Sequence, residues 1–246
     1  MTFGSPHRHY RQTDSTNERA KELAMAGAPS GLVVTADEQS AGRGRRGNAW
    51  FAPAGACLLY SALLRPFEAE QAPLLPLAVP IAVCEAAEAI APVRCQVKWP
   101  NDVWIGERKV AGVLAEARPD EGWAVIGVGL NVAIPDEGFP AELRETAISL
   151  LPTEAEGELP PGGAPGVRRA LMALNESLAR WVRASEDEVL NAYRPRDVLC
   201  GRRISWEDGS GLAEEVDERG HLVVARDDGE RVTLGAGEVH LAVERP

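Results

Sequence analysis

The chain has 246 residues and a formal net charge of −11 at pH 7, with 26 lysines and arginines against 37 aspartates and glutamates. A negative surface repels nucleic-acid phosphates, and no apolar run approaches the length of a membrane span, so the composition argues against nucleic-acid and membrane partners. The four cysteines are scattered without a C-x-x-C pair, and no export signal is visible. We therefore expect a cytoplasmic protein without a zinc site.

The first predicted helix follows the stretch DSTN. Ser15 and Glu18 have the spacing of a capping box, and small and apolar side chains recur at helical spacing after them. This pattern predicts a helix from about 16 to 27. The run LVVTA (32–36) then predicts a short buried strand, and CLLYSALL (57–64) predicts another.

Between these two strands, GRGRRGNAW (42–50) places three arginines and three glycines in six consecutive positions. Glycine lets the backbone approach a ligand closely, and arginine supplies paired donors for carboxylate or phosphate oxygens. The loop therefore indicates an anion clamp. Taken alone, it is equally compatible with an RGG-like nucleic-acid segment or a solvated surface loop.

Apolar residues then recur at helical spacing over 74–91, although Pro73, Pro76 and Pro80 predict a helix that begins late or is kinked. Three strand-like runs follow with short turns between them: RCQVKW (94–99), KVAGVLAEA (109–117) and WAVIGVGLNVAI (123–134). Such a series predicts an antiparallel meander. Together these elements indicate an α+β fold, a mixed sheet flanked by helices.

The C-terminal part begins with a Pro/Gly-rich stretch (151–166) that predicts a surface loop, followed by helical periodicity over 167–181. From about residue 196 the pattern changes to short strands split by turns, which is typical of a small β-barrel. We therefore divide the chain into a large domain (1–195) and a small one (196–246).

Two further clusters could line a site. KWPNDVWIGERKVAG (98–112) brings Asn101, Asp102 and Lys109 close to strand ends, where side chains often line pockets, although an Asx turn and a solvated lysine explain them equally well. GVGLNV (127–132) has glycines inside a strand, which mark either a close approach to a ligand or a β-bulge.

The order of these motifs, from DSTN through the Arg/Gly loop and KWPND to GVGLNV and a small C-terminal β-domain, resembles the biotin–protein ligases over essentially the whole chain. The resemblance implies a class II synthetase-like biotin/lipoate ligase domain followed by an SH3-like β-barrel. It also implies activation of biotin to biotinyl-5′-AMP by ATP with Mg²⁺, and transfer of the biotinyl group to a lysine of a biotin carboxyl carrier domain, as in acetyl-CoA carboxylase. The short stretch before DSTN leads us to expect the monofunctional form, without a DNA-binding domain.

The resemblance also implies residue roles, although it names no metal ligands. The implied catalytic residues are Lys109, Arg45 and Asp102. The implied biotin-binding residues are Ser15, Thr16, Asn17, Gln39, Arg43, Gly44, Arg45, Lys109 and Gly112. The implied ATP or adenylate-binding residues are Arg43, Arg45, Trp50, Asn101, Lys109 and Asn131. One departure is Asn48, which stands where many relatives have a further arginine and lowers the positive charge of the loop.

Two other readings compete with a biotin ligase. A lipoate–protein ligase shares the fold and the chemistry but needs a long apolar slot, whereas DSTN with Gln39 offers polar groups. A nucleic-acid-binding module could use the Arg/Gly loop, but the sequence pI near 5.0 argues against it. Biotin is therefore the favoured substrate.

Overall fold

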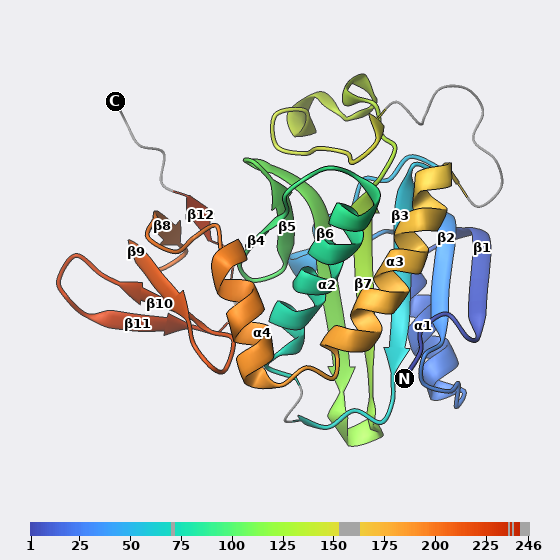
Figure 1. Cartoon of the computed structure of the whole chain (residues 1–246), viewed down its shortest axis with the longest axis horizontal. Helices are drawn as coiled ribbons and strands as arrows, with labels where there is room; N and C mark the ends of the chain where they lie inside the picture. The colour runs from blue at the N-terminus through green and yellow to red at the C-terminus, as the bar shows by residue number, and fades with distance from the viewer. Residues whose placement is uncertain (70–71, 153–162, 236, 238, 242–246) are drawn as a thin grey trace.

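A seven-stranded mixed sheet forms the centre of the computed structural model, which describes residues 1–69, 72–152, 163–235, 237 and 239–241 (Figure 1). Its strands are β1 (His7–Thr13), β2 (Val33–Gln39), β3 (Cys57–Leu64), β4 (Gln96–Lys98), β5 (Asp102–Ile105), β6 (Arg108–Arg118) and β7 (Trp123–Asn131). They lie in the order β1-β2-β3-β7-β6-β5-β4, with β1 parallel to β2 and the other pairs antiparallel. The predicted mixed sheet is confirmed, and the predicted meander is present with a fourth strand, β5, between β4 and β6.

The helices are α1 (Thr16–Met25), α2 (Leu75–Ile90), α3 (Pro165–Trp181) and α4 (Glu186–Tyr193). Helices α2 and α3 cover one face of the sheet (Figure 1). Because side chains alternate along a strand, β3 turns Leu58 and Tyr60 toward this core and Leu63 toward α1. Ser61 shares the α1 side with Leu63, and that face of the sheet carries the pocket described below.

The capping-box prediction for α1 is wrong, although the helix lies within the expected range. Ser15 is the N-cap residue, but its side chain accepts no capping hydrogen bond. The Glu18 carboxylate instead pairs with Lys21 Nζ at 2.8 Å and with Arg43. Two cations compete more strongly for a carboxylate than one backbone amide does.

The proline-rich helix α2 begins at Leu75, one residue into the predicted range, so it does not start late, and the alternative of a kinked helix stays a prediction. Pro76 lies in the first turn of α2, where a backbone N–H would have no hydrogen-bond partner within the helix, so proline sacrifices no helical hydrogen bond there. Pro80 lies inside the helix. The sequence analysis did not predict β5 or α4, which have only four and eight residues. Of the predicted 151–166 loop, residues 153–162 lie outside the described part of the chain.

The C-terminal strands form a second sheet of five antiparallel strands: β8 (Arg203–Trp206), β9 (Gly209–Val216), β10 (Leu222–Ala225), β11 (Arg231–Leu234) and β12 (His240–Leu241). A closed barrel is not confirmed, because β11 and β12 lie at opposite edges and do not pair within the described residues. Ile204 and Leu222 join the core beneath α2, and Trp99 Nε1 donates to Gly220 O at 2.9 Å.

None of the helices in the described part of the chain combines the length and apolar character needed to span a bilayer.

Candidate active site

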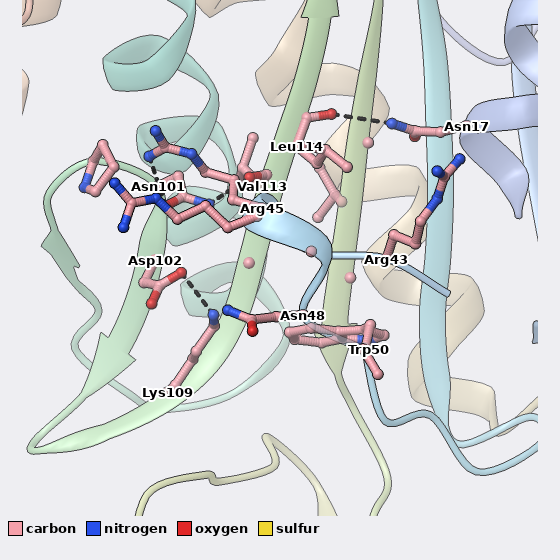
Figure 2. A pocket seen from close by; sticks show the side chains of 18 of the residues that line it. Asn17, Arg43, Arg45, Asn48, Trp50, Asn101, Asp102, Lys109, Val113 and Leu114 are labelled. Atoms are coloured by element: carbon pink, nitrogen blue, oxygen red, sulfur yellow. Dashed lines mark hydrogen bonds and ion pairs between the residues drawn. The ribbon is translucent and has the colours of Figure 1, made fainter. Parts of the chain in front are cut away.

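The main pocket lies over the α1 side of β6 and β7, between the start of α1, the Arg/Gly loop and β5 (Figure 2). All predicted site residues except Asn131 line it: Ser15, Thr16, Asn17, Gln39, Arg43, Gly44, Arg45, Trp50, Asn101, Asp102, Lys109 and Gly112. The register of the sheet explains the open space. Gly112 pairs with Gly129, and Gly127 lies between Ser61 and Leu114, so glycines form part of the pocket floor.

The Arg/Gly loop folds into a compact turn at the mouth of the pocket. Gly44 N donates to Asn48 O at 2.7 Å, and Trp50 N donates to Gly42 O at 3.0 Å. From this turn Arg43 and Arg45 point in different directions (Figure 2). Arg45 Nη1 lies 3.4 Å from Asn101 Oδ1, and Arg43 pairs with Glu18 of α1. The loop therefore supplies positive charge to both ends of the pocket.

At the β5–β6 end, Lys109 Nζ forms an ion pair with Asp102 Oδ1 at 2.7 Å. The two residues lie on adjacent antiparallel strands, and a register shift in β5 after Val103 brings them together. Lys109 Nζ also lies 5.6 Å from the ring centroid of Trp50, within range of a cation–π interaction. These contacts fix an ammonium group against the floor of the pocket, where it can meet an anion.

The Trp50 indole lies against the glycines of β6 and β7. A Cβ added to Gly129 would stand 2.5 Å from Trp50 Cε2, and one added to Gly112 would stand 3.2 Å from Cζ3. Glycine is therefore required for the ring to lie this close. Gly112 was expected to let the strand approach biotin, but in this structure it adjoins Trp50 and Lys109.

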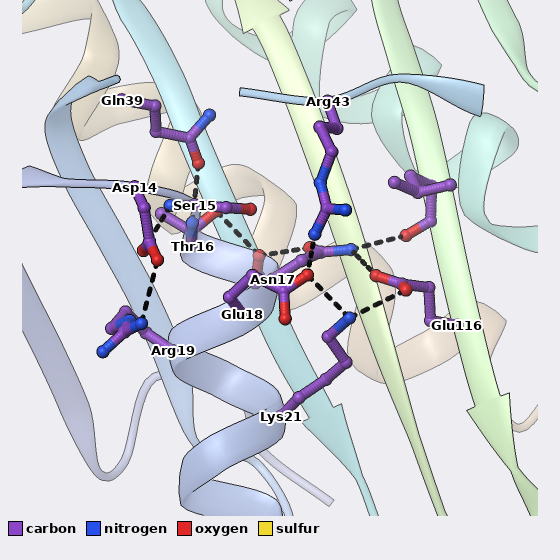
Figure 3. A network of polar contacts seen from close by, with 12 residues as sticks. Asp14, Ser15, Thr16, Asn17, Glu18, Arg19, Lys21, Gln39, Arg43 and Glu116 are labelled. Carbon is purple, nitrogen blue, oxygen red and sulfur yellow. Dashed lines mark hydrogen bonds and ion pairs between the residues drawn. The ribbon is translucent and has the colours of Figure 1, made fainter. Parts of the chain in front are cut away.

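The opposite, polar end is built from the start of α1 and Gln39 (Figure 3). Gln39 Oε1 accepts from the Thr16 backbone N–H at 2.7 Å, and Asn17 Nδ2 donates to Leu114 O at 3.2 Å. The backbone N–H of Ser15 donates to Asp14 Oδ1 at 2.6 Å. Ser15, Thr16 and Asn17 are buried, so a ligand that enters this end meets fixed polar groups.

Two polar residues behind this end were missed by sequence reasoning. Ser61 is fully buried in β3, and its hydroxyl lies 2.6 Å from Asn17 Oδ1. Glu116 of β6 accepts from Asn17 Nδ2 at 2.8 Å and from Lys21 Nζ at 2.9 Å. The one serine inside the apolar run CLLYSALL was the available signal for Ser61.

The Glu116 carboxyl is held in its charged form. Burial raises its pKa, but hydrogen bonds from Lys21 and Asn17 and the charges of Lys21 and Arg43 outweigh burial, so the pKa is lowered overall. The carboxylate therefore remains an acceptor at neutral pH.

Asn131 is the one predicted site residue that the structure does not bring to this pocket. It is buried at the end of β7, where Nδ2 donates to Ile148 O at 3.1 Å and its backbone oxygen accepts from Leu150 N. In this structure Asn131 holds the 148–150 segment against the sheet.

Acidic groups are scarce around the pocket. Within the described residues, no group of three histidine, cysteine, aspartate or glutamate side chains could hold a metal ion. Among the lining residues that the structure describes, Asp102 is the one carboxylate. A divalent cation here would rely mainly on oxygens that a ligand brings with it.

Comparison with known proteins agrees with this geometry. The model of the biotin/lipoate A/B protein ligase family matches residues 9–132. The biotin–[acetyl-CoA-carboxylase] ligase of Mycobacterium tuberculosis is 35% identical over 240 residues, which cover 93% of this chain and 86% of that protein. The bifunctional ligase/repressor BirA of Bacillus spizizenii is 39% identical over 148 residues, but the match spans 58% of this chain and only 45% of that protein.

A solved structure gives the same result over almost the whole chain. The biotin protein ligase of Aquifex aeolicus in complex with biotin and ATP has a TM-score of 0.76 and 29% sequence identity, covering 96% of this chain and 98% of that one.

Proposed function

This chain belongs to the biotin/lipoate A/B protein ligase family, and on that premise we propose that it activates biotin with ATP and attaches it to a carrier protein. The observation that carries the proposal is one pocket with fixed polar groups at one end and Lys109, Asp102 and Arg45 at the other. A carboxylate-bearing molecule with a polar head fits such an arrangement.

The reaction has two steps. A carboxylate oxygen of biotin bonds to the α-phosphorus of ATP, and pyrophosphate leaves. A lysine amine of the carrier then bonds to the acyl carbon, loses a proton, and AMP leaves. Neither step needs a protein nucleophile, so the work of the chain is to hold two anions together and stabilise the charge that develops between them.

We assign that electrostatic work to three residues. Lys109 supplies a compact positive charge between the carboxylate and the α-phosphate, and Arg45 adds paired donors from the loop. Asp102, 2.7 Å from Lys109 Nζ, orients the ammonium group and could accept the proton of the incoming amine. Arg43 closes the loop over the biotin chain once an anion displaces Glu18.

The nucleotide side of the proposal rests on Trp50 and Asn101. The indole offers a flat surface for adenine, and the Asn101 amide lies beside Arg45. Asn131 keeps its proposed adenine role only if the 148–150 segment moves away from it. Mg²⁺ would arrive with the ATP phosphates, since Asp102 is the one carboxylate among the described pocket-lining residues.

The proposed macromolecular partner is a biotin carboxyl carrier domain, as the name of the Mycobacterium relative suggests. ATP is the energy source, so the proposal places the reaction in the cytoplasm. We further propose a catalytic part (1–195) and a small part (196–246) of SH3-like topology, supported by the antiparallel strands β8 to β12.

Lipoate is the second candidate substrate, because the family includes lipoate ligases. Lipoate has a dithiolane ring without hydrogen-bond donors, which would leave the polar side chains of Thr16, Asn17 and Gln39 unsatisfied. Biotin is therefore the favoured substrate.

The direct test is transfer. The protein is incubated with MgATP, biotin and a biotin carboxyl carrier domain, and the carrier is analysed by mass spectrometry. The expected result is one biotinyl group on one lysine, and none on a carrier in which that lysine is replaced by arginine. An unmodified wild-type carrier would refute the proposal.

A further inference from the structure

Three side chains at the polar end, Thr16, Asn17 and Gln39, have a defined hydrogen-bonding direction, because each is already partnered by other protein groups (Figure 3). Asn17 shows this most clearly. Its Nδ2 has two hydrogens, and both are used, one by Leu114 O at 3.2 Å and one by Glu116 Oε2 at 2.8 Å. Asn17 can therefore meet a ligand only through Oδ1, as an acceptor.

Ser61 fixes the direction of the next group. Its hydroxyl oxygen lies 2.6 Å from Asn17 Oδ1 and 2.8 Å from Thr16 Oγ1. A carbonyl oxygen cannot donate, so the single Ser61 proton goes to Asn17. The Thr16 proton then goes to Ser61, which leaves Thr16 Oγ1 to meet a ligand as an acceptor.

Gln39 offers a ligand a hydrogen-bond donor, whereas Thr16 and Asn17 offer acceptors. Its Oε1 is occupied by the Thr16 backbone N–H at 2.7 Å, so its Nε2 amino group is what it can offer to a ligand, as a donor. These three residues therefore accept at two atoms and donate at one. A cyclic urea is the complement of this pattern, with two N–H groups and one carbonyl oxygen.

We propose that Ser61 and Glu116 are specificity-determining positioning residues, which keep Thr16 and Asn17 as acceptors and so select a cyclic urea. The inference rests on the proposed function and deepens it. Neither residue needs to touch the substrate. Ser61 is fully buried beneath Asn17 and Thr16, and Glu116 holds Asn17 from the side while its second oxygen binds Lys21.

The first test is Ser61→Ala, followed by biotin-dependent pyrophosphate exchange. Asn17 and Thr16 then lose the group that directs them, so KM for biotin should rise about tenfold, the effect of one lost buried hydrogen bond, while KM for ATP and kcat change little. Ser177→Ala is the matched control, because Ser177 Oγ donates to Glu85 at 2.9 Å on α2, away from the pocket.

The second test is Glu116→Gln. The glutamine oxygen should turn to Lys21, so its amino group faces Asn17 and forces that amide to rotate, again raising KM for biotin. Adding Lys21→Met removes the competing cation, lets the glutamine oxygen return to Asn17, and should restore KM. Glu22→Gln is the control, because it removes an ion pair with Arg19 on the same helix but touches no pocket group.

A polarity readout separates this role from general loss of structure. A biotin analogue methylated on one ureido nitrogen lacks one donor and should be a poor substrate of the wild type. The ratio of the KM of this analogue to the KM of biotin should be smaller in Ser61→Ala and Glu116→Gln than in the wild type. The pocket of each variant no longer prefers a ligand that donates hydrogen bonds. Thermal unfolding of each variant reports whether the fold is intact.

Three outcomes would overturn the inference: an unchanged KM for biotin, equal rises in KM for biotin and ATP, or an unchanged preference between biotin and the methylated analogue. Wild-type enzyme without biotin-dependent exchange would instead refute the proposed function, so the two failures are distinguishable.

Discussion

At the scale of single residues, the three pocket cations to which we assign roles each lie beside a polar or acidic partner. Lys109 pairs with Asp102, Arg45 lies beside Asn101, and Arg43 pairs with Glu18. These partners keep the positive groups apart and oriented, and two substrate anions can replace or join them. The charge needed for catalysis is thus largely pre-positioned.

Lys109→Ala should remove most adenylate formation without unfolding the protein. Loss of one positioned charge at a reacting phosphate costs about 10² to 10³ in rate, whereas a partly exposed ion pair contributes about 1 kcal/mol or less to stability. Biotin-dependent pyrophosphate exchange and thermal unfolding measure the two effects. Near-normal exchange in the variant would show that Lys109 is not the catalytic charge.

Substitutions at two of the three floor glycines should affect the KM values of biotin and ATP differently. A Cβ at Gly127 would lie 2.2 Å from Asn17 Oδ1, and one at Gly129 would lie 2.5 Å from Trp50 Cε2. Gly127→Ala should therefore raise mainly KM for biotin, by about tenfold, and Gly129→Ala mainly KM for ATP. Each variant is the control for the other. If Gly127→Ala and Gly129→Ala changed the KM values for biotin and ATP in the same way, the assignment of one pocket end to biotin and the other to ATP would be contradicted.

At the scale of elements, three regions distant in sequence meet at one face of the sheet: the start of α1, the Arg/Gly loop, and the consecutive strands β6 and β7. The loop is the exposed part of this set, and Arg43 and Arg46 are accessible to solvent. Ordering of such a loop around bound anions would shield the mixed anhydride from water.

Trypsin should test this closure. The free protein should be cut at Arg43, Arg45 or Arg46, and cleavage should slow markedly with biotin plus ATP, because charge-assisted hydrogen bonds to the adenylate hold the loop. Asn48 in place of an arginine should make the protection partial. Equal cleavage with and without ligands, in enzyme shown to make the adenylate, would mean that the loop is not a closing clamp.

A second element-scale prediction concerns the junction of α2 with the 194–196 turn. Arg196 donates to both oxygens of Glu88, at 2.6 and 2.8 Å. Burial raises the pKa of Glu88, but the hydrogen bonds from Arg196 and the Cys95 amide and the charge of Arg196 outweigh it, so the pKa is lowered overall. Because its pKa is lower in the folded state, ionised Glu88 stabilises the protein at pH values above its unfolded-state pKa of 4.5. This stabilisation is lost as the pH falls through the folded-state pKa.

Glu88→Gln should therefore lower the free energy of unfolding by about 1 to 2 kcal/mol at pH 7. The difference from the wild type should shrink as the pH falls below the unfolded-state pKa of 4.5. Urea unfolding of both proteins at pH 7, 5 and 4 measures it, and a difference independent of pH would contradict the ionic origin.

At the scale of the whole molecule, the sequence predicted the mixed sheet, and all predicted site residues except Asn131 line the main pocket. It did so because glycines, arginines and polar side chains interrupt apolar runs at strand ends. The sequence could not show that Glu18 forms ion pairs instead of capping α1, because one of those ion pairs is a tertiary contact with Arg43 of the loop. Nor could it find Ser61 and Glu116, whose roles exist only through contacts across the sheet, or place Asn131 outside the pocket.

The C-terminal sheet is part of this whole-molecule picture. It shares the core with α2 through Ile204 and Leu222, and Gly237 and Val239 reach the edge of the main pocket. The short strand periodicity predicted its strands, but the closure of a barrel depends on edge pairing that no periodicity encodes. Its contact with the pocket supports a role in the reaction cycle.

The central claim is that this pocket activates biotin, and pyrophosphate exchange into ATP tests it most directly. Exchange is measured with biotin, with lipoate and with neither, at equal protein concentration. We predict exchange that depends on biotin and is close to background with lipoate or without an acid. Equal exchange with lipoate, or no exchange with biotin, would contradict the claim.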